Sequence, residues 1–193
     1  MVLLLCIFSL CSCSKQSVYR IDSFTWMSNS DVGIKVAYTY TESGKPSTVT
    51  VTYPYPLEES YTDTFNYNIW DTLKSVTRTF STGNEVIYSA KKITNHKYIL
   101  YDNEKEYLTI IFDHSGFIIS YRYANGYITE YAFSYDENGK PISMKQLNIT
   151  PSGSNKTVDY TITFIDSNTY HLYTFDNEDE YYEVKFQKIE VKG

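Results

Sequence analysis

The segment Ala124–Pro141, with the sequence ANGYITEYAFSYDENGKP, carries the pattern that decides the fold. One side of an extended chain here is aromatic, at Tyr127, Tyr131, Phe133 and Tyr135, with Thr129 among them. The other side carries Glu130, Ser134 and Asp136. Because successive side chains of a strand point to opposite faces, this alternation predicts a β-strand with one buried face. Asn125-Gly126 predicts a hairpin with a type I′ turn, since both residues tolerate positive φ.

The same alternation recurs in both directions along the chain, most clearly at 34–41, 48–53 and 158–164. Turn-forming sequences separate the alternating segments, at 42–46, 82–84, 114–116, 125–126, 137–141 and 152–154. A long meander of this kind must hide its edge strands. The pattern therefore predicts an all-β fold: an antiparallel meander curled into a barrel, a half-barrel or a β-sandwich, with little or no helix.

Two stretches depart from the regular pattern. Trp70–Val76 is compatible with one or two helical turns, but its Thr content argues equally for a strand. Tyr53–Ser60 is the longest predicted loop, and it could separate an N-terminal hairpin from the main sheet.

The composition fits one folded domain with an aromatic, acidic character. The chain has 193 residues, among them 21 Tyr but only 8 Gly, and a net charge of −6. Tyrosine favours strands with a partly solvated face, because its ring packs while its hydroxyl stays in water. The negative charge offers no basic surface for polyphosphates, so no nucleic-acid partner is expected.

The N-terminus resembles a bacterial lipoprotein signal. Val2–Leu10 is an apolar run too short to cross a bilayer, and Leu10-Cys11-Ser12-Cys13 resembles the lipobox. The resemblance implies that Met1–Ser12 is removed and that Cys13 carries the lipid. Residues 13–17 are then a tether and residues 18–193 a single antiparallel β domain.

That resemblance also implies an anchor in the outer membrane. No acidic run follows Cys13, which favours a periplasm-facing protein over a surface-exposed one. The basic residues usual after the initiator Met are missing. The alternatives are a plain secretory signal with incidental cysteines, or an apolar first strand of the domain.

No catalytic, cofactor or metal motif is visible in the rest of the sequence. Cys13 is the only cysteine left after cleavage, so a disulfide or a thiolate nucleophile is not expected in the domain. His96, His114 and His171 are scattered without ligand spacing. The acidic stretch 176–180 could hold Ca²⁺, but it lacks the spacing of a calcium loop and fits a solvated turn better. We therefore predict no enzyme activity, no cofactor and no metal.

A faint internal repeat suggests a family. Tyr38–Pro46 parallels Phe133–Pro141, and Phe112–Phe117 is a looser third copy. This style of hairpin is similar to that of Rhs-type repeats. Together with the lipobox and the size, it more closely resembles the uncharacterised DUF4595-type lipoproteins of Bacteroidota, which implies a porin-like β fold and brings no catalytic residues.

The sequence favours a non-catalytic binding or accessory lipoprotein that takes up a glycan, a lipid or a protein partner. Trp26 and Trp70 are the speculative ligand-binding residues, because tryptophan stacks on sugars and lines apolar cavities. The alternatives are an interaction module without a small-molecule site and a transmembrane β-barrel. Against the last, the tyrosines follow whole strands, and the chain ends without a terminal aromatic residue.

Overall fold

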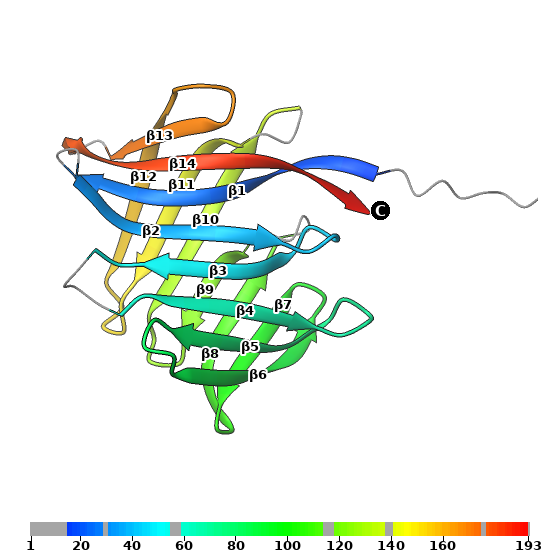
Figure 1. Ribbon diagram of the computed structural model, residues 1–193. Helices are drawn as coiled ribbons and strands as arrows, with labels where there is room; N and C mark the ends of the chain where they lie inside the picture. Colours follow the sequence, from blue (N-terminus) through cyan, green and yellow to red (C-terminus); the bar gives the residue numbers. More distant parts are fainter. Residues whose placement is uncertain are drawn as a thin grey trace, which may run out of the picture.

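The chain folds as one closed, antiparallel β-barrel (Figure 1). A computed structural model describes residues 15–28, 31–54, 59–113, 118–137, 141–174 and 177–192. Its strands are β1 (Lys15–Ser28), β2 (Asp31–Tyr40), β3 (Pro46–Thr52), β4 (Tyr61–Tyr67), β5 (Leu73–Phe80), β6 (Glu85–Thr94), β7 (Lys97–Asp102), β8 (Lys105–Phe112), β9 (Ile118–Tyr123), β10 (Ile128–Tyr135), β11 (Pro141–Ile149), β12 (Asn155–Phe164), β13 (Thr169–Thr174) and β14 (Asn177–Lys192).

Each strand pairs with the next along the chain, and β1 pairs with β14 to close the sheet. This confirms the predicted all-β meander and selects the barrel among the three predicted forms. The closing pair runs from Lys15 opposite Lys192 to Ser28 opposite Glu180. Strand β1 thus begins at Lys15, inside the segment predicted as tether and before the predicted domain start at Val18, because the long β14 supplies a partner for it.

The two stretches that departed from the sequence pattern lie inside the same sheet. Residues 68–72 form a turn and β5 starts at Leu73, so the described residues contain no helix at 70–76. Strand β3 pairs directly with β4, from Thr48 opposite Thr64 to Val51 opposite Tyr61. The loop after Tyr53 therefore does not separate a hairpin from the sheet.

Five hairpins close with one type of turn. After β2, β4, β5, β9 and β11, an N–H donates to the carbonyl three residues earlier, and the donor is Gly44, Asp71, Gly83, Gly126 or Gly153. Each of these donors has a positive φ, from 56° to 92°. This is a type I turn followed by a left-handed residue in a bulge. The predicted type I′ turn at Asn125-Gly126 is wrong because only Gly126 has positive φ, whereas Asn103 and Glu104, between β7 and β8, both do.

The barrel is flattened, with two hydrophobic clusters in its interior. Strands β1–β5 cross in front of β8–β12 in Figure 1. One cluster is built from β3 to β9, around Leu73, Leu100 and Ile110. The other joins β1 to β11–β14, around Tyr170 and Leu172. Tyr38 packs against both clusters.

Polar and apolar side chains share the outer face of the barrel, where Ile87, for example, is exposed. This face carries the ion pairs Lys145–Asp159 (3.1 Å), Arg122–Glu130 (2.6 Å) and Lys185–Glu183 (2.9 Å). Threonine hydroxyls also pair across strands there, as between Thr39 and Thr48 at 2.8 Å. Within the described part of the chain, no helix has the length and apolar character needed to cross a bilayer.

The meander gives the barrel two distinct ends. The terminal end carries the start of β1, the end of β14 and the turns 41–45, 68–72, 95–96 and 165–168. The distal end carries the turns 81–84, 103–104, 124–127 and 150–154.

Candidate functional site

The barrel is wide, and large aromatic side chains are needed to fill its interior. Eight strands enclose a space that side chains just fill, and more strands enclose a wider one. Tyr and Phe therefore supply most of the large interior side chains, often in direct ring contact. Phe24 and Tyr182 stack with centroids 4.4 Å apart, and Tyr88 and Tyr107 at 4.6 Å. Between these rings the interior keeps two cavities.

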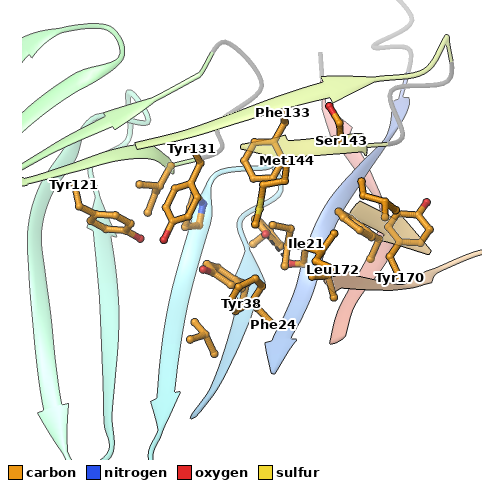
Figure 2. A pocket seen from close by; sticks show the side chains of 17 residues that line it. Ile21, Phe24, Tyr38, Tyr121, Tyr131, Phe133, Ser143, Met144, Tyr170 and Leu172 are labelled. Carbon is orange, nitrogen blue, oxygen red and sulfur yellow. Dashed lines mark hydrogen bonds between the residues drawn. The ribbon is translucent and has the colours of Figure 1, made fainter. Parts of the chain in front are cut away.

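The first cavity is apolar and has a volume of about 120 Å³. It lies between β1 and β2 on one side and β9–β14 on the other, and Figure 2 shows the side chains around it. Its lining includes Phe24, Phe133, Met144, Ile162 and Leu172. Tyr40, at its edge, donates its hydroxyl to the carbonyl of Ile21 at 2.7 Å, so this polar group is satisfied.

Three tyrosines form a boundary between the two cavities. Tyr38, Tyr121 and Tyr131 line both of them, and Figure 2 shows the three rings along one side of the first cavity. Burial raises the pKa of each phenol, to about 12 for Tyr131. The hydroxyls therefore stay protonated, as neutral hydrogen-bonding groups. We call these three residues the tyrosine waist.

The second cavity is larger, about 230 Å³, and contains an ion pair. Asp63 on β4 lies opposite Arg78 on β5. Nε and Nη2 of Arg78 donate to the two carboxylate oxygens of Asp63, each at 2.8 Å. The side chains of Asp63 and Arg78 are each 16% exposed. Burial alone would lower the pKa of Arg78, but the hydrogen bonds and the charge of Asp63 outweigh it and raise that pKa.

Aromatic rings surround the guanidinium. The Tyr61 ring lies under it, with its centroid 3.9 Å from Cζ, and the Tyr88 ring is 5.9 Å away. Burial raises the pKa of Tyr88 to about 12 and also raises that of Tyr123, which lines the same cavity. At physiological pH the cavity thus offers one paired cation, one carboxylate and neutral phenols.

A chain of neutral hydrogen bonds extends from this cavity along the opposite wall. Thr129, which lines the cavity, donates to Oδ1 of Asn148 at 3.1 Å. Gln146 donates to the same oxygen at 3.0 Å, and Tyr160 donates to Oε1 of Gln146 at 2.8 Å. These interior amides are held in fixed orientations by one another.

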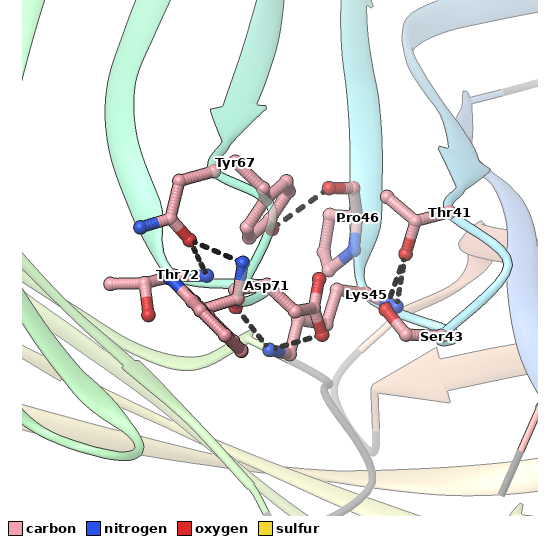
Figure 3. Close-up of polar contacts among 9 residues, drawn as sticks. Thr41, Ser43, Lys45, Pro46, Tyr67, Asp71 and Thr72 are labelled. Carbon is pink, nitrogen blue, oxygen red and sulfur yellow. Dashed lines mark hydrogen bonds and ion pairs between the residues drawn. The ribbon is translucent and has the colours of Figure 1, made fainter.

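A third pocket, of about 340 Å³, lies at the terminal end. Lys45 contacts Asp71 twice there, at 2.7 Å to the carbonyl oxygen and 2.6 Å to the carboxylate, and so joins two turns (Figure 3). Tyr67 donates to the carbonyl of Pro46 at 2.9 Å. Trp70 lines this pocket from the 68–72 turn and is 80% exposed.

A buried cation lies at the same end. Arg20 is 4% exposed and donates from Nε to the carbonyl of Gly44 at 3.2 Å. Burial lowers the pKa of Arg20, against the opposing effects of Tyr40, Asp113 and Tyr135. The 41–45 turn therefore covers a charged group of β1.

The structure places the predicted site residues apart. Trp26 lies half-buried on β1 against Gly33, and it lines none of the three cavities above. Trp70 lies on the outer pocket, so the two tryptophans do not form one site. Cys13 lies outside the described residues, as does Asp176 of the acidic stretch 176–180. The described residues contain no group of three or more His, Cys, Asp or Glu side chains placed to hold a metal ion.

The sequence carries a signal for the ion pair in the alternation of two consecutive strands. In Tyr61–Tyr67, YTDTFNY, the alternation puts Asp63 on the same face as Tyr61 and Phe65. In Leu73–Phe80, LKSVTRTF, it puts Arg78 with Val76 and Phe80. Opposite charges on the aromatic faces of consecutive predicted strands indicate a pair inside the fold. Comparisons of the sequence with models of known protein families and with curated proteins found no match.

Proposed function

We propose that this protein is a cell-envelope lipoprotein that binds a small apolar molecule, such as an acyl chain, inside its barrel. One observation carries the proposal: the interior of a closed barrel contains an apolar cavity of about 120 Å³. Apolar cavities of this kind stay dry and accept apolar guests. Such a protein needs no catalytic group, and we assign it none.

An apolar guest in this cavity would stabilise the fold. Apolar space in a protein core is worth about 24 cal/mol per Å³, so a guest that fills 120 Å³ gains at most about 3 kcal/mol. That is a large share of the 5–15 kcal/mol by which most domains are stable. A guest that binds only the folded state also stabilises it by mass action.

The binding test uses the full chain carrying Cys13→Ala, so that no attached lipid competes. We expect 1-octanol to raise the melting temperature and to be retained in native mass spectrometry. Ile162→Phe should weaken this effect, because the larger ring occupies part of the cavity. Ile87→Phe, the same substitution at a 65% exposed position, is the control and should not. A melting temperature that octanol leaves unchanged would argue for the interaction module without a small-molecule site.

The anchor is a separate part of the proposal. Its support is the lipobox Leu10-Cys11-Ser12-Cys13. We propose that the lipid holds the protein on the periplasmic side of the outer membrane. Cys13→Ala should move the protein from the membrane fraction to the soluble fraction. An unchanged membrane fraction would contradict the lipoprotein assignment. The resemblance to DUF4595-type lipoproteins stays a prediction.

A further inference from the structure

We infer that the second cavity recognises a neutral, hydroxyl-bearing head group, such as a sugar, on the ligand whose apolar part lies in the first cavity. The inference rests on the proposed function. It also names the class of ligand: an uncharged amphiphile with several hydroxyl groups. The Asp63–Arg78 pair is the centre of the recognition site.

The pair is expensive to place inside the barrel. Removing two charges from water costs several kcal/mol per ion, and apolar residues of similar size often stabilise a fold equally well or better. The β4–β5 register does not depend on it, because Phe65 opposite Val76 buries two apolar side chains and the 68–72 turn closes the hairpin. Stability therefore gives no reason to keep the pair.

The pair retains unused hydrogen-bonding capacity that faces a cavity. Arg78 has five N–H hydrogens and uses one on Nε and one on Nη2 for Asp63. The other three have no acceptor among the described residues. Each carboxylate oxygen of Asp63 can accept a further bond. A hydroxyl group, which donates and accepts at once, is the ligand group that matches both sides of such a pair.

The charge of the site favours an uncharged ligand. Asp63 already neutralises Arg78, so a phosphate or carboxylate would meet no net positive charge. Tyr61 stacks on the guanidinium and leaves aromatic surface in the cavity wall, and Tyr88 and Tyr123 add more. Aromatic faces beside a planar set of donors and acceptors suit a sugar ring, which has apolar faces and hydroxyl edges.

The two cavities are neighbours, and the proposed amphiphile would lie across both. The tyrosine waist and Val36 line each of them. The first cavity is lined mainly by apolar side chains, whereas the second contains the ion pair and Thr129. A molecule with its chain in the first and its head in the second matches this change of polarity at the waist.

Three probes with the same eight-carbon chain test the inference: octyl β-D-glucoside, octyl phosphate and 1-octanol, each below its micelle concentration. Their affinities for the full chain carrying Cys13→Ala are measured by isothermal titration calorimetry. We expect the glucoside to bind about tenfold more tightly than octanol, the gain from one or two charge-assisted hydrogen bonds. The phosphate should bind no better than octanol.

Two variants place the effect on the pair. Asp63→Leu combined with Arg78→Met should reduce the glucoside affinity to that of octanol and leave octanol binding unchanged, which also shows that the barrel is folded. Arg78→Lys, which keeps the charge but loses the planar fork, should weaken glucoside binding severalfold. The control is Glu130→Leu with Arg122→Met, a cross-strand pair on the outer face that should not change either affinity.

The outcomes separate the two proposals. If none of the three probes binds, the proposed function is wrong. If octanol binds and the glucoside binds no better, the proposed function stands and the head-group site is wrong. If the phosphate binds most tightly, the cavity is an anion site and the inference is likewise wrong. A glucoside preference that survives in the double variant would show that the pair is not the recognition site.

Discussion

Raising the pH should unfold this protein abruptly, because its interior is built from neutral tyrosines. Burial raises the pKa of eleven of them: Tyr38, Tyr40, Tyr61, Tyr67, Tyr88, Tyr121, Tyr123, Tyr131, Tyr135, Tyr160 and Tyr182. Several also donate hydrogen bonds that a tyrosinate cannot make, as Tyr40 does to the carbonyl of Ile21.

The sign and the size of the effect follow from proton linkage. Below pH 10, the pKa of tyrosine in an unfolded chain, both states are protonated and the stability is fully present. Above it the unfolded chain releases protons first, so stability falls until the folded pKa is reached. Each such tyrosine then removes about 1.4 kcal/mol per pH unit. Five of them, such as Tyr38, Tyr40, Tyr67, Tyr121 and Tyr131, would remove about 7 kcal/mol per unit, comparable with a whole domain's stability.

The assay follows tyrosinate absorbance and far-ultraviolet circular dichroism in parallel as the pH rises. We expect the main rise in absorbance to coincide with loss of the strand signal between about pH 11 and 12, and to be steeper than a single titration. Tyr38→Phe should reduce the slope of the unfolding free energy against pH by the contribution of one tyrosine, about 1.4 kcal/mol per pH unit. Tyr127→Phe, on a 52% exposed turn residue, is the control. Ionisation of most tyrosines near pH 10 in a folded barrel would refute the reasoning.

Three further outcomes are expected. In urea titrations, Gly44→Ala should lower the free energy of unfolding more than Gly83→Ala. Both substitutions introduce about 1–2 kcal/mol of strain at a positive φ. Only at Gly44 would the new methyl also overlap a neighbour, Cγ1 of Val191 at 2.7 Å. Asp63→Asn should cost about 3 kcal/mol, whereas Asp63→Leu with Arg78→Met should be within about 1 kcal/mol of wild type; an additive double variant would contradict this. Glu183→Gln should cost under about 1 kcal/mol at neutral pH. The hydrogen bond from Lys185 lowers the pKa of Glu183, so the difference should vanish as acid protonates that carboxylate.

The strands were predictable because the period-two pattern records which side of each strand is buried. The 124–141 segment predicted β10, its inward aromatic face and the turn before it. The type of that turn was not predictable from Asn125-Gly126 alone, because the strand pairing decides which residue takes positive φ. Asp71 occupies a left-handed position that glycine fills in the other four hairpins of this kind, so composition gave no sign of it.

Closure and the cavities depend on contacts between distant parts of the chain. The pairing of β1 with β14 joins residues more than 150 positions apart, and no local pattern specifies it. The tyrosine waist places Tyr38 of β2 beside the same cavities as Tyr121 of β9 and Tyr131 of β10, which lie far from it in the sequence. Asp63 and Arg78 differ in this respect. They lie on consecutive strands, and their place among inward aromatic residues could have been read from the alternation.

The even number of strands fixes which way the barrel would stand on a membrane. With fourteen strands in an up-and-down order, the chain enters and leaves at the same end. Only two peptide units separate Cys13 from Lys15, a reach of about 7 Å. A lipid on Cys13, if the lipobox prediction holds, would therefore tether the barrel by its terminal end. Trp70 and Lys45 would then face the bilayer, and the turns of the distal end would point into the compartment.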